Sequence, residues 1–182
     1  GTAIQSDDLE FGFVKENIHL EQAAAFFNVV RIKNNRQEVL KGELSFSLPE
    51  GWKNLGVGSV ALELAPGEEF LYPVRISVPP GMRGGISYSI SAEIRVDDYY
   101  DYSTSYVSVE SISKWDMYVS SKELFIYETN STESFDIRLV NDGNKVELVK
   151  LEFDVGGLLK MEGSGYSGKD LFVELEPFRD TI

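Results

Sequence analysis

Hydrophobic residues recur at every second position along most of the chain, and β-branched and aromatic side chains fill many of these positions. A period of two is typical of β-strands that turn one face toward a core. In the first 110 residues the pattern predicts strands near Leu9–Val14, Ile18–Leu20, Ala24–Lys33, Val39–Leu48, Val57–Leu64, Glu69–Val78, Gly85–Val96 and Tyr102–Glu110.

Turn-forming clusters separate these segments, namely Asn34–Arg36, Pro49–Gly51, Ala65–Gly67 and Pro79–Gly81. Proline presets φ, while glycine and asparagine tolerate positive φ, so such clusters end strands. Short strands that recur every 8 to 12 residues or so are typical of antiparallel sandwiches. The sequence therefore predicts an all-β fold of antiparallel β-sandwiches.

The chain also repeats its own pattern. At an offset of 107 residues, Asn34 aligns with Asn141 and Phe46 with Phe153. After a four-residue insertion the offset becomes 111, and Leu64 aligns with Leu175. Because apolar positions, turn residues and strand lengths stay in phase, we expect two copies of one sandwich, at residues 1–112 and 113–182.

The second copy is shorter than the first. Three further strands are expected after Pro66, whereas only five residues follow the aligned Pro177. A partial sandwich leaves an apolar face and open strand edges, which pair with other chains. We expect either that the chain is a fragment, or that a partner strand or a different arrangement of the chain completes the second copy. If residue 182 is the true end, completion by a partner strand predicts a strand-swapped dimer.

Composition narrows the chemistry further. The chain has 17 Lys+Arg against 30 Asp+Glu, a net charge of −13, which argues against nucleic acid as a partner. It contains no Cys and one His, His19, which excludes thiolate nucleophiles, disulfides and histidine metal clusters. His19 lies in an alternating stretch and is expected to face outward from a strand. We expect no enzymatic activity, no cofactor and no metal site.

No apolar run in the sequence approaches the ~18 residues that cross a bilayer, so no transmembrane segment is expected.

Several motifs resemble one known family. The stretch Leu44–Trp52 contains Leu-Pro-Glu-Gly-Trp, and Leu64–Glu68 with Val74–Tyr88 continues the likeness. Residues 15–96 are similar to bacterial NEW3-type immunoglobulin-like domains, whereas the second copy has Val155–Leu159 in place of Pro-Glu-Gly-Trp. The resemblance implies tandem immunoglobulin-like sandwiches. It also implies a noncatalytic accessory or spacer domain of secreted or cell-envelope proteins, located in the periplasm, at the cell surface or outside the cell.

One acidic and aromatic segment is the candidate binding site. Loops of a sandwich cluster at its ends and carry most binding sites. The segment expected to form such a loop is Asp97, Asp98, Tyr99, Tyr100, Asp101 and Tyr102. Tyrosine offers contact area and a hydroxyl to proteins or sugars. The first expectation for this segment is a solvated hairpin tip, and the two alternatives are a partner surface and a cation site completed by Glu68 and Glu69.

The linker at residues 111–113 is short and is expected to hold the two copies end to end. Residues expected at their junction are Trp52, Met82, Trp115, Asn141 and Asp142. The alternative, that each tryptophan covers the edge of its own core, stays open.

These observations favour a structural or interaction module that spaces its neighbours and displays its loops to a protein or glycan partner. One alternative is a carbohydrate-binding accessory module that uses Tyr99, Tyr100 and Tyr102. A second alternative is a periplasmic chaperone-like pair of sandwiches with an edge strand open for pairing.

Overall fold

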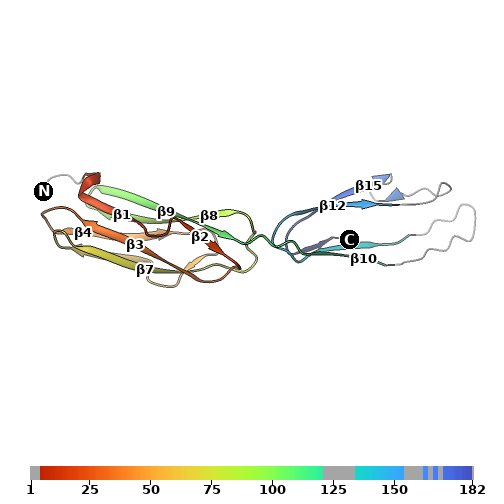
Figure 1. Cartoon of the computed structure of the whole chain (residues 1–182), viewed down its shortest axis with the longest axis horizontal. Helices are drawn as coiled ribbons and strands as arrows, with labels where there is room; N and C mark the ends of the chain where they lie inside the picture. Colours follow the sequence, from red (N-terminus) through yellow and green to blue (C-terminus); the bar gives the residue numbers. More distant parts are fainter. Residues whose placement is uncertain (1–4, 121–133, 154–161, 164–165, 168–169, 182) are drawn as a thin grey trace, which may run out of the picture. The chain divides into compact units, whose positions relative to one another are not determined.

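The computed structural model describes residues 5–120, 134–153 and 170–181, together with the backbone at 162–163 and 166–167. It divides into two compact units, Gly1–Glu110 and Ser111–Ile182. Apart from a 3-10 turn, η1 (Ser6–Asp8), every regular element of the described part is a strand (Figure 1). The predicted all-β fold class is confirmed.

Two sheets pack face to face in the first unit. One sheet has the order β1-β3-β7-β5, with β1 (Leu9–Phe13), β3 (Phe26–Asn34), β7 (Glu69–Ser77) and β5 (Lys53–Asn54). The other has the order β2-β9-β8-β4-β6, with β2 (Asn17–Leu20), β9 (Tyr99–Val109), β8 (Ser87–Val96), β4 (Leu40–Ser47) and β6 (Ser59–Leu64).

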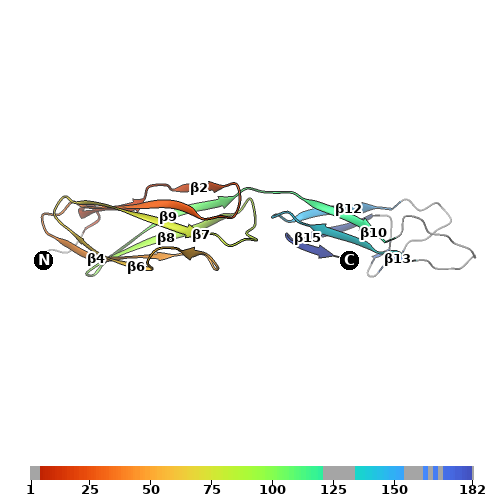
Figure 2. The same ribbon diagram turned by 90° about the horizontal axis from the view of Figure 1, so that it is seen from below.

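The chain changes sheets between its first two strands. β1 pairs antiparallel with β3, whereas β2 lies parallel to β9, from Asn17↔Tyr106 to Leu20↔Val109 (Figure 2). All other ladders of the described residues are antiparallel. The sheet change gives each layer of the sandwich a strand from the amino-terminal part of the chain.

The period of two explains the core of the first unit. On β8, every second residue from Ile90 to Val96 is buried, while the residues between them are more exposed. Each buried isoleucine or valine side chain contributes about 1.5–3 kcal/mol when it is fully buried. The other strands add alternate residues to the same core, among them Val30, Ile32, Leu40, Leu44, Leu64, Val74, Ile76 and Val107.

A fully buried asparagine fixes the turn after β3. The Asn34 side-chain amide donates to the backbone carbonyls of Glu38 at 2.9 Å, Leu64 at 3.0 Å and Ala65 at 3.1 Å. Its Oδ1 accepts from the Arg36 backbone N–H at 3.0 Å. This amide therefore satisfies backbone groups from two turns that lie far apart in the sequence.

The second unit has the same kinds of ladder in its described part. One sheet has the order β10-β11-β16, with β10 (Trp115–Val119), β11 (Ile137–Asn141) and β16 (Arg179–Thr181). A second ladder joins β12 (Glu147–Glu152) to β15 (Asp170–Leu175), and a short one joins β13 (Glu162–Gly163) to β14 (Tyr166–Ser167). Leu139, Val149, Leu151 and Leu175 form its core.

Aligned positions of the two units have the same partners. Asn141 is also fully buried, and its amide donates to the carbonyls of Lys145 at 2.9 Å and Leu175 at 3.0 Å. Its Oδ1 accepts from the Gly143 N–H at 3.0 Å. The strand registers also correspond: Leu40↔Leu64 with Glu147↔Leu175, Ser45↔Ser59 with Glu152↔Asp170, and Lys33↔Glu69 with Val140↔Asp180.

The predicted strands of the first unit agree with the observed bounds to within two residues, with one exception. Strand β9 begins at Tyr99, not at Tyr102, so the prediction of its start was wrong. The ladder between β8 and β9 continues up to the pair Val96↔Tyr99, and hydrogen bonding there outweighs the polar composition of the segment.

Candidate functional site

The candidate acidic tip is a two-residue turn. Because Val96 pairs with Tyr99, only Asp97 and Asp98 lie between β8 and β9. Asp97 has φ of +51°, in the left-handed region that Asp tolerates better than most residues. The predicted loop over Asp97–Tyr102 is therefore corrected, since its last four residues belong to strand β9.

Strand geometry divides the candidate residues between two faces of the sheet. Tyr99 is partly buried against the core, and its hydroxyl donates to Asp101 Oδ2 at 3.3 Å. Burial, and secondarily the Asp101 carboxylate, raises the pKa of the Tyr99 hydroxyl above its ordinary value. Tyr100 and Tyr102 lie on the opposite, outer face because side chains alternate along a strand.

A row of exposed tyrosines follows the outer face of β9. Tyr100, Tyr102 and Tyr106 are 53%, 65% and 49% exposed. Their cross-strand partners on β8 are polar: Arg95, Glu93 and Ser89. Sequence analysis missed Tyr106, although its spacing of four residues from Tyr102 puts it on the same face of a strand. We call Tyr100, Tyr102 and Tyr106 the tyrosine row.

The tyrosine row has the chemistry of a contact surface. Successive same-face positions lie roughly 7 Å apart along a strand, so the rings form a line beside hydroxyl and charged groups. Partial loss of hydration, followed by the neighbouring Glu93 carboxylate, raises the pKa of the Tyr100 hydroxyl. At neutral pH this hydroxyl keeps its proton and can both donate and accept a hydrogen bond.

The carboxylates that were considered for a cation site have other partners. Glu69 Oε1 accepts from Arg31 Nε at 2.5 Å, and Glu68 Oε2 accepts from the Ala65 N–H at 2.7 Å. Across the part of the chain that the structure describes, no group of three or more His, Asp or Glu residues is arranged to hold a metal ion. His19 lies on β2, exposed, with Nε2 2.6 Å from Glu110 Oε2.

Of the residues expected at the junction, two belong to the first unit. Trp52 is buried in the core, with its ring centroid 6.1 Å from that of Phe26 and 5.6 Å from that of Tyr88. Met82 packs partly buried against the same core. This is the packing of a loop aromatic that covers its own core edge, and a junction role for both residues stays a prediction.

The other three junction candidates belong to the second unit. Trp115 begins β10 and is exposed, whereas Asn141 is the buried turn residue described above. Asp142 lies 3.8 Å from the Lys114 ammonium, and its N–H donates to the Lys114 carbonyl at 2.8 Å. Their junction role likewise stays a prediction.

Comparisons with known proteins support the family assignment for the first unit. Residues 26–97 match the family model described as the NPCBM-associated, NEW3 domain of alpha-galactosidase. This match confirms the NEW3-type resemblance for that segment. No curated protein matches the chain.

Two solved structures resemble the chain at low sequence identity. The FixG-related protein from Vibrio parahaemolyticus is 13% identical, with a TM-score of 0.46 over 57% of this chain and 98% of its own. The PapD-like domain 7 of human CEP192 is 16% identical, with a TM-score of 0.39 over 62% of this chain and 90% of its own.

Among the residues with described positions, no helix has the length and apolar character to span a membrane.

Proposed function

Residues 26–97 carry a NEW3 domain, and from this premise we propose that the chain is a noncatalytic accessory module that spaces its neighbours and displays a binding surface. The family match is the observation that carries the proposal. The family description names the domain as one of alpha-galactosidase. We further propose an extracytoplasmic location, in the periplasm, at the cell surface or in the secreted fraction, where glycan-active proteins meet their substrates.

We also propose that the second unit is a second copy of the same sandwich. The two buried asparagines support this reading, because each donates to one carbonyl four residues ahead and to one from a distant turn. The shared strand registers support it independently. A repeat of this kind lengthens a spacer by adding a second unit with the same fold.

The spacer role depends on the stiffness of the sandwich. The first unit buries one continuous core between its sheets, so its ends stay at a fixed separation. Spin labels at Ser87→Cys, the first residue of β8, and at Asp98→Cys, in the turn after β8, test this directly because the chain has no other cysteine. At a rise of about 3.3 Å per residue the labelled backbone positions are roughly 35 Å apart.

We expect one narrow distribution of distances between the labels, unchanged up to the melting transition. A broad distribution in the native protein would contradict a stiff spacer. The noncatalytic character is tested separately with chromogenic galactosides, for which we expect no turnover. Turnover that scales with protein concentration and disappears when one carboxylate is replaced would contradict it.

The tyrosine row favours a second candidate function, carbohydrate binding. Exposed aromatic rings with neighbouring hydroxyl and charged groups suit the faces and hydroxyls of sugars. The test is a glycan array with the unchanged chain and the Tyr100→Ala and Tyr102→Ala double variant. Tyr118→Ala is the matched control, since Tyr118 is similarly exposed on a different unit.

If the tyrosine row binds glycans, the double variant loses the signal and the control keeps it. Equal signals from all three proteins would show that the tyrosine row does not bind glycans. This result would not affect the proposed spacer role.

A further inference from the structure

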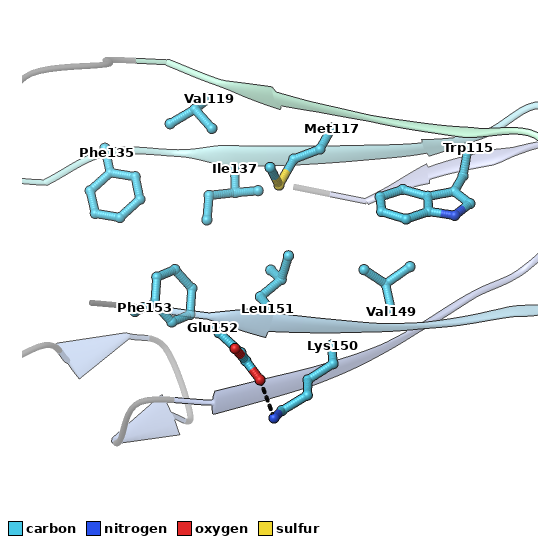
Figure 3. A pocket seen from close by; sticks show the side chains of 10 residues that line it. All are labelled: Trp115, Met117, Val119, Phe135, Ile137, Val149, Lys150, Leu151, Glu152 and Phe153. Carbon is cyan, nitrogen blue, oxygen red and sulfur yellow. Dashed lines mark hydrogen bonds and ion pairs between the residues drawn. The ribbon is translucent and has the colours of Figure 1, made fainter. Parts of the chain in front are cut away.

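An apolar groove opens between the two sheets of the second unit (Figure 3). Trp115, Met117 and Val119 of β10 point toward Val149 and Leu151 of β12 across a cavity of about 350 Å³. The rest of the apolar lining is supplied by Phe135, Ile137 and Phe153. The Lys150 and Glu152 side chains extend from the other side of β12.

The aligned positions of the first unit are covered. In the ladders, Trp115 pairs with Asn141 as Leu9 pairs with Asn34, and Val119 therefore corresponds to Phe13. Leu9 and Phe13 are 5% and 8% exposed, whereas Trp115 and Val119 are 41% and 39% exposed. Side chains of the same apolar character are thus buried in one unit and open in the other, and exposed apolar area of this kind marks a binding surface.

In the first unit the sheet that contains β8 and β9 provides that cover: β9 lies against β1, and β8 lies between β9 and β4. Strand β8 is the neighbour of β4. It pairs antiparallel with β4, from Glu43↔Arg95 to Ser47↔Ser91, and buries alternate apolar side chains between the sheets. Strand β12 is the counterpart of β4, and among the described residues its only ladder is with β15. With respect to the described residues, the second edge of β12 therefore offers backbone groups in position to pair with an extended chain.

We propose that this groove accepts a donor β-strand, an extended polypeptide segment that pairs antiparallel with the Glu147–Glu152 edge as β8 pairs with β4. The donor carries apolar side chains at alternate positions, which enter the groove beside Met117 and Leu151. Main-chain hydrogen bonds supply affinity and the alternate side chains supply selectivity, as in other cases of strand addition. The shared register of the two units is what identifies a strand, and not a compact molecule, as the occupant.

Charges on the outer side of β12 define the donor further. In the first unit Glu43 lies opposite Arg95, and Ser45 lies opposite Glu93. The aligned positions in the second unit are Lys150 and Glu152. The donor therefore has an acidic residue where β8 has Arg95 and a basic residue where β8 has Glu93, because like charges directly opposite each other destabilise a ladder.

The test titrates the full chain, at low salt, with two labelled peptides of the Ser87–Val96 sequence. One peptide is unchanged, and the other carries Glu93→Lys and Arg95→Glu. We expect the charge-reversed peptide to bind about fivefold more tightly or better, since two cross-strand charge pairs change sign. Emission of the exposed Trp115 should shift to the blue on binding, while the buried Trp52 contributes a constant background.

Two chain variants locate the binding site. Met117→Lys introduces an ammonium into the groove and should weaken binding by about tenfold or more. Tyr118→Lys is the matched control on the other face of β10, is equally exposed to solvent, and should change affinity by less than about twofold. Lys150→Glu should abolish the preference between the two peptides, because each peptide then makes one favourable and one unfavourable charge pair. The unchanged peptide should gain affinity in this variant, which separates strand pairing from loss of folding.

Other results overturn the proposal. Equal affinity of the unchanged chain for the two peptides would show nonspecific binding without strand pairing. The same conclusion would follow if Met117→Lys left the peptide affinity unchanged. Concentration-dependent self-association that Met117→Lys abolishes, without peptide binding, would make a second copy of the chain the occupant. Binding of an apolar dye in the groove, without peptide binding, would make it a small-molecule site.

Discussion

The buried amide of Asn34 leads to a sharp prediction about stability. Asn34→Ala removes donors to the carbonyls of Glu38, Leu64 and Ala65 and the acceptor for the Arg36 N–H. Bulk water cannot take over the hydrogen bonds of the lost amide, because the position is fully buried.

The magnitude follows from the contacts. A typical hydrogen bond contributes about 1 kcal/mol net, and a buried group left without a partner costs about 1–3 kcal/mol. Four contacts are lost, and three of them come from the same side-chain NH2 group, so their energies do not add in full. We therefore expect Asn34→Ala to lower the free energy of unfolding by about 3–5 kcal/mol. This is a large part of the roughly 5–15 kcal/mol that stabilises a domain.

The assay is urea unfolding followed by tryptophan fluorescence. The chain has two tryptophans, one in each unit, so a Trp115→Phe background leaves Trp52 to report on the first unit. Asn35→Ala is the control, because Asn35 is the adjacent asparagine and is exposed. It should cost less than about 1 kcal/mol. If Asn34→Ala cost no more than Asn35→Ala, the reasoning would be refuted.

Three further predictions concern the first unit. Trp52→Ala should cost about 3–5 kcal/mol in urea unfolding and Trp52→Phe much less, because the indole N–H has no partner among the described residues; equal costs would contradict this. The pKa of the Tyr99 hydroxyl is raised in the folded protein. Its contribution to the free energy of unfolding is therefore present below about pH 10 and is lost as the pH rises further. Tyr99→Phe should make this alkaline loss of stability shallower in melts between about pH 9 and 11, and identical slopes would argue against it. A methyl group at Gly42 would lie 2.5 Å from the Arg95 carbonyl oxygen, so Gly42→Ala should cost about 1–3 kcal/mol or more, whereas Gly58→Ala, in open space, should be nearly neutral in the same unfolding assay.

Local patterns predicted most of the strands but not their partners. The alternation at Ile18–Leu20 indicated a strand, yet the parallel ladder with β9 depends on residues almost ninety positions away in the sequence. Strand pairing is non-local, so a short alternating segment carries no information about which sheet it joins. The same holds for the two-residue strand β5, which has too few residues to show any period.

The candidate site was only partly predictable. The segment Asp97–Tyr102 was identified by its residue types, but polar composition concealed that β9 starts at Tyr99 and that alternate tyrosines face opposite ways. A buried asparagine is equally hidden, because a polar residue in a turn cluster is normally exposed. The alignment of Asn34 with Asn141 was the available signal, and both prove to be fully buried.

The parallel ladder between β2 and β9 has a mechanical consequence. If the first unit is pulled by its two ends, the force draws Asn17–Leu20 and Tyr106–Val109 past each other along their length. Two flanking hydrogen bonds, from Tyr106 N–H to the Glu16 carbonyl and from Glu110 N–H to the Leu20 carbonyl, are loaded in the same direction. These bonds must break together and not one after another, so a protein stretched between two anchor points would resist rupture at this seam.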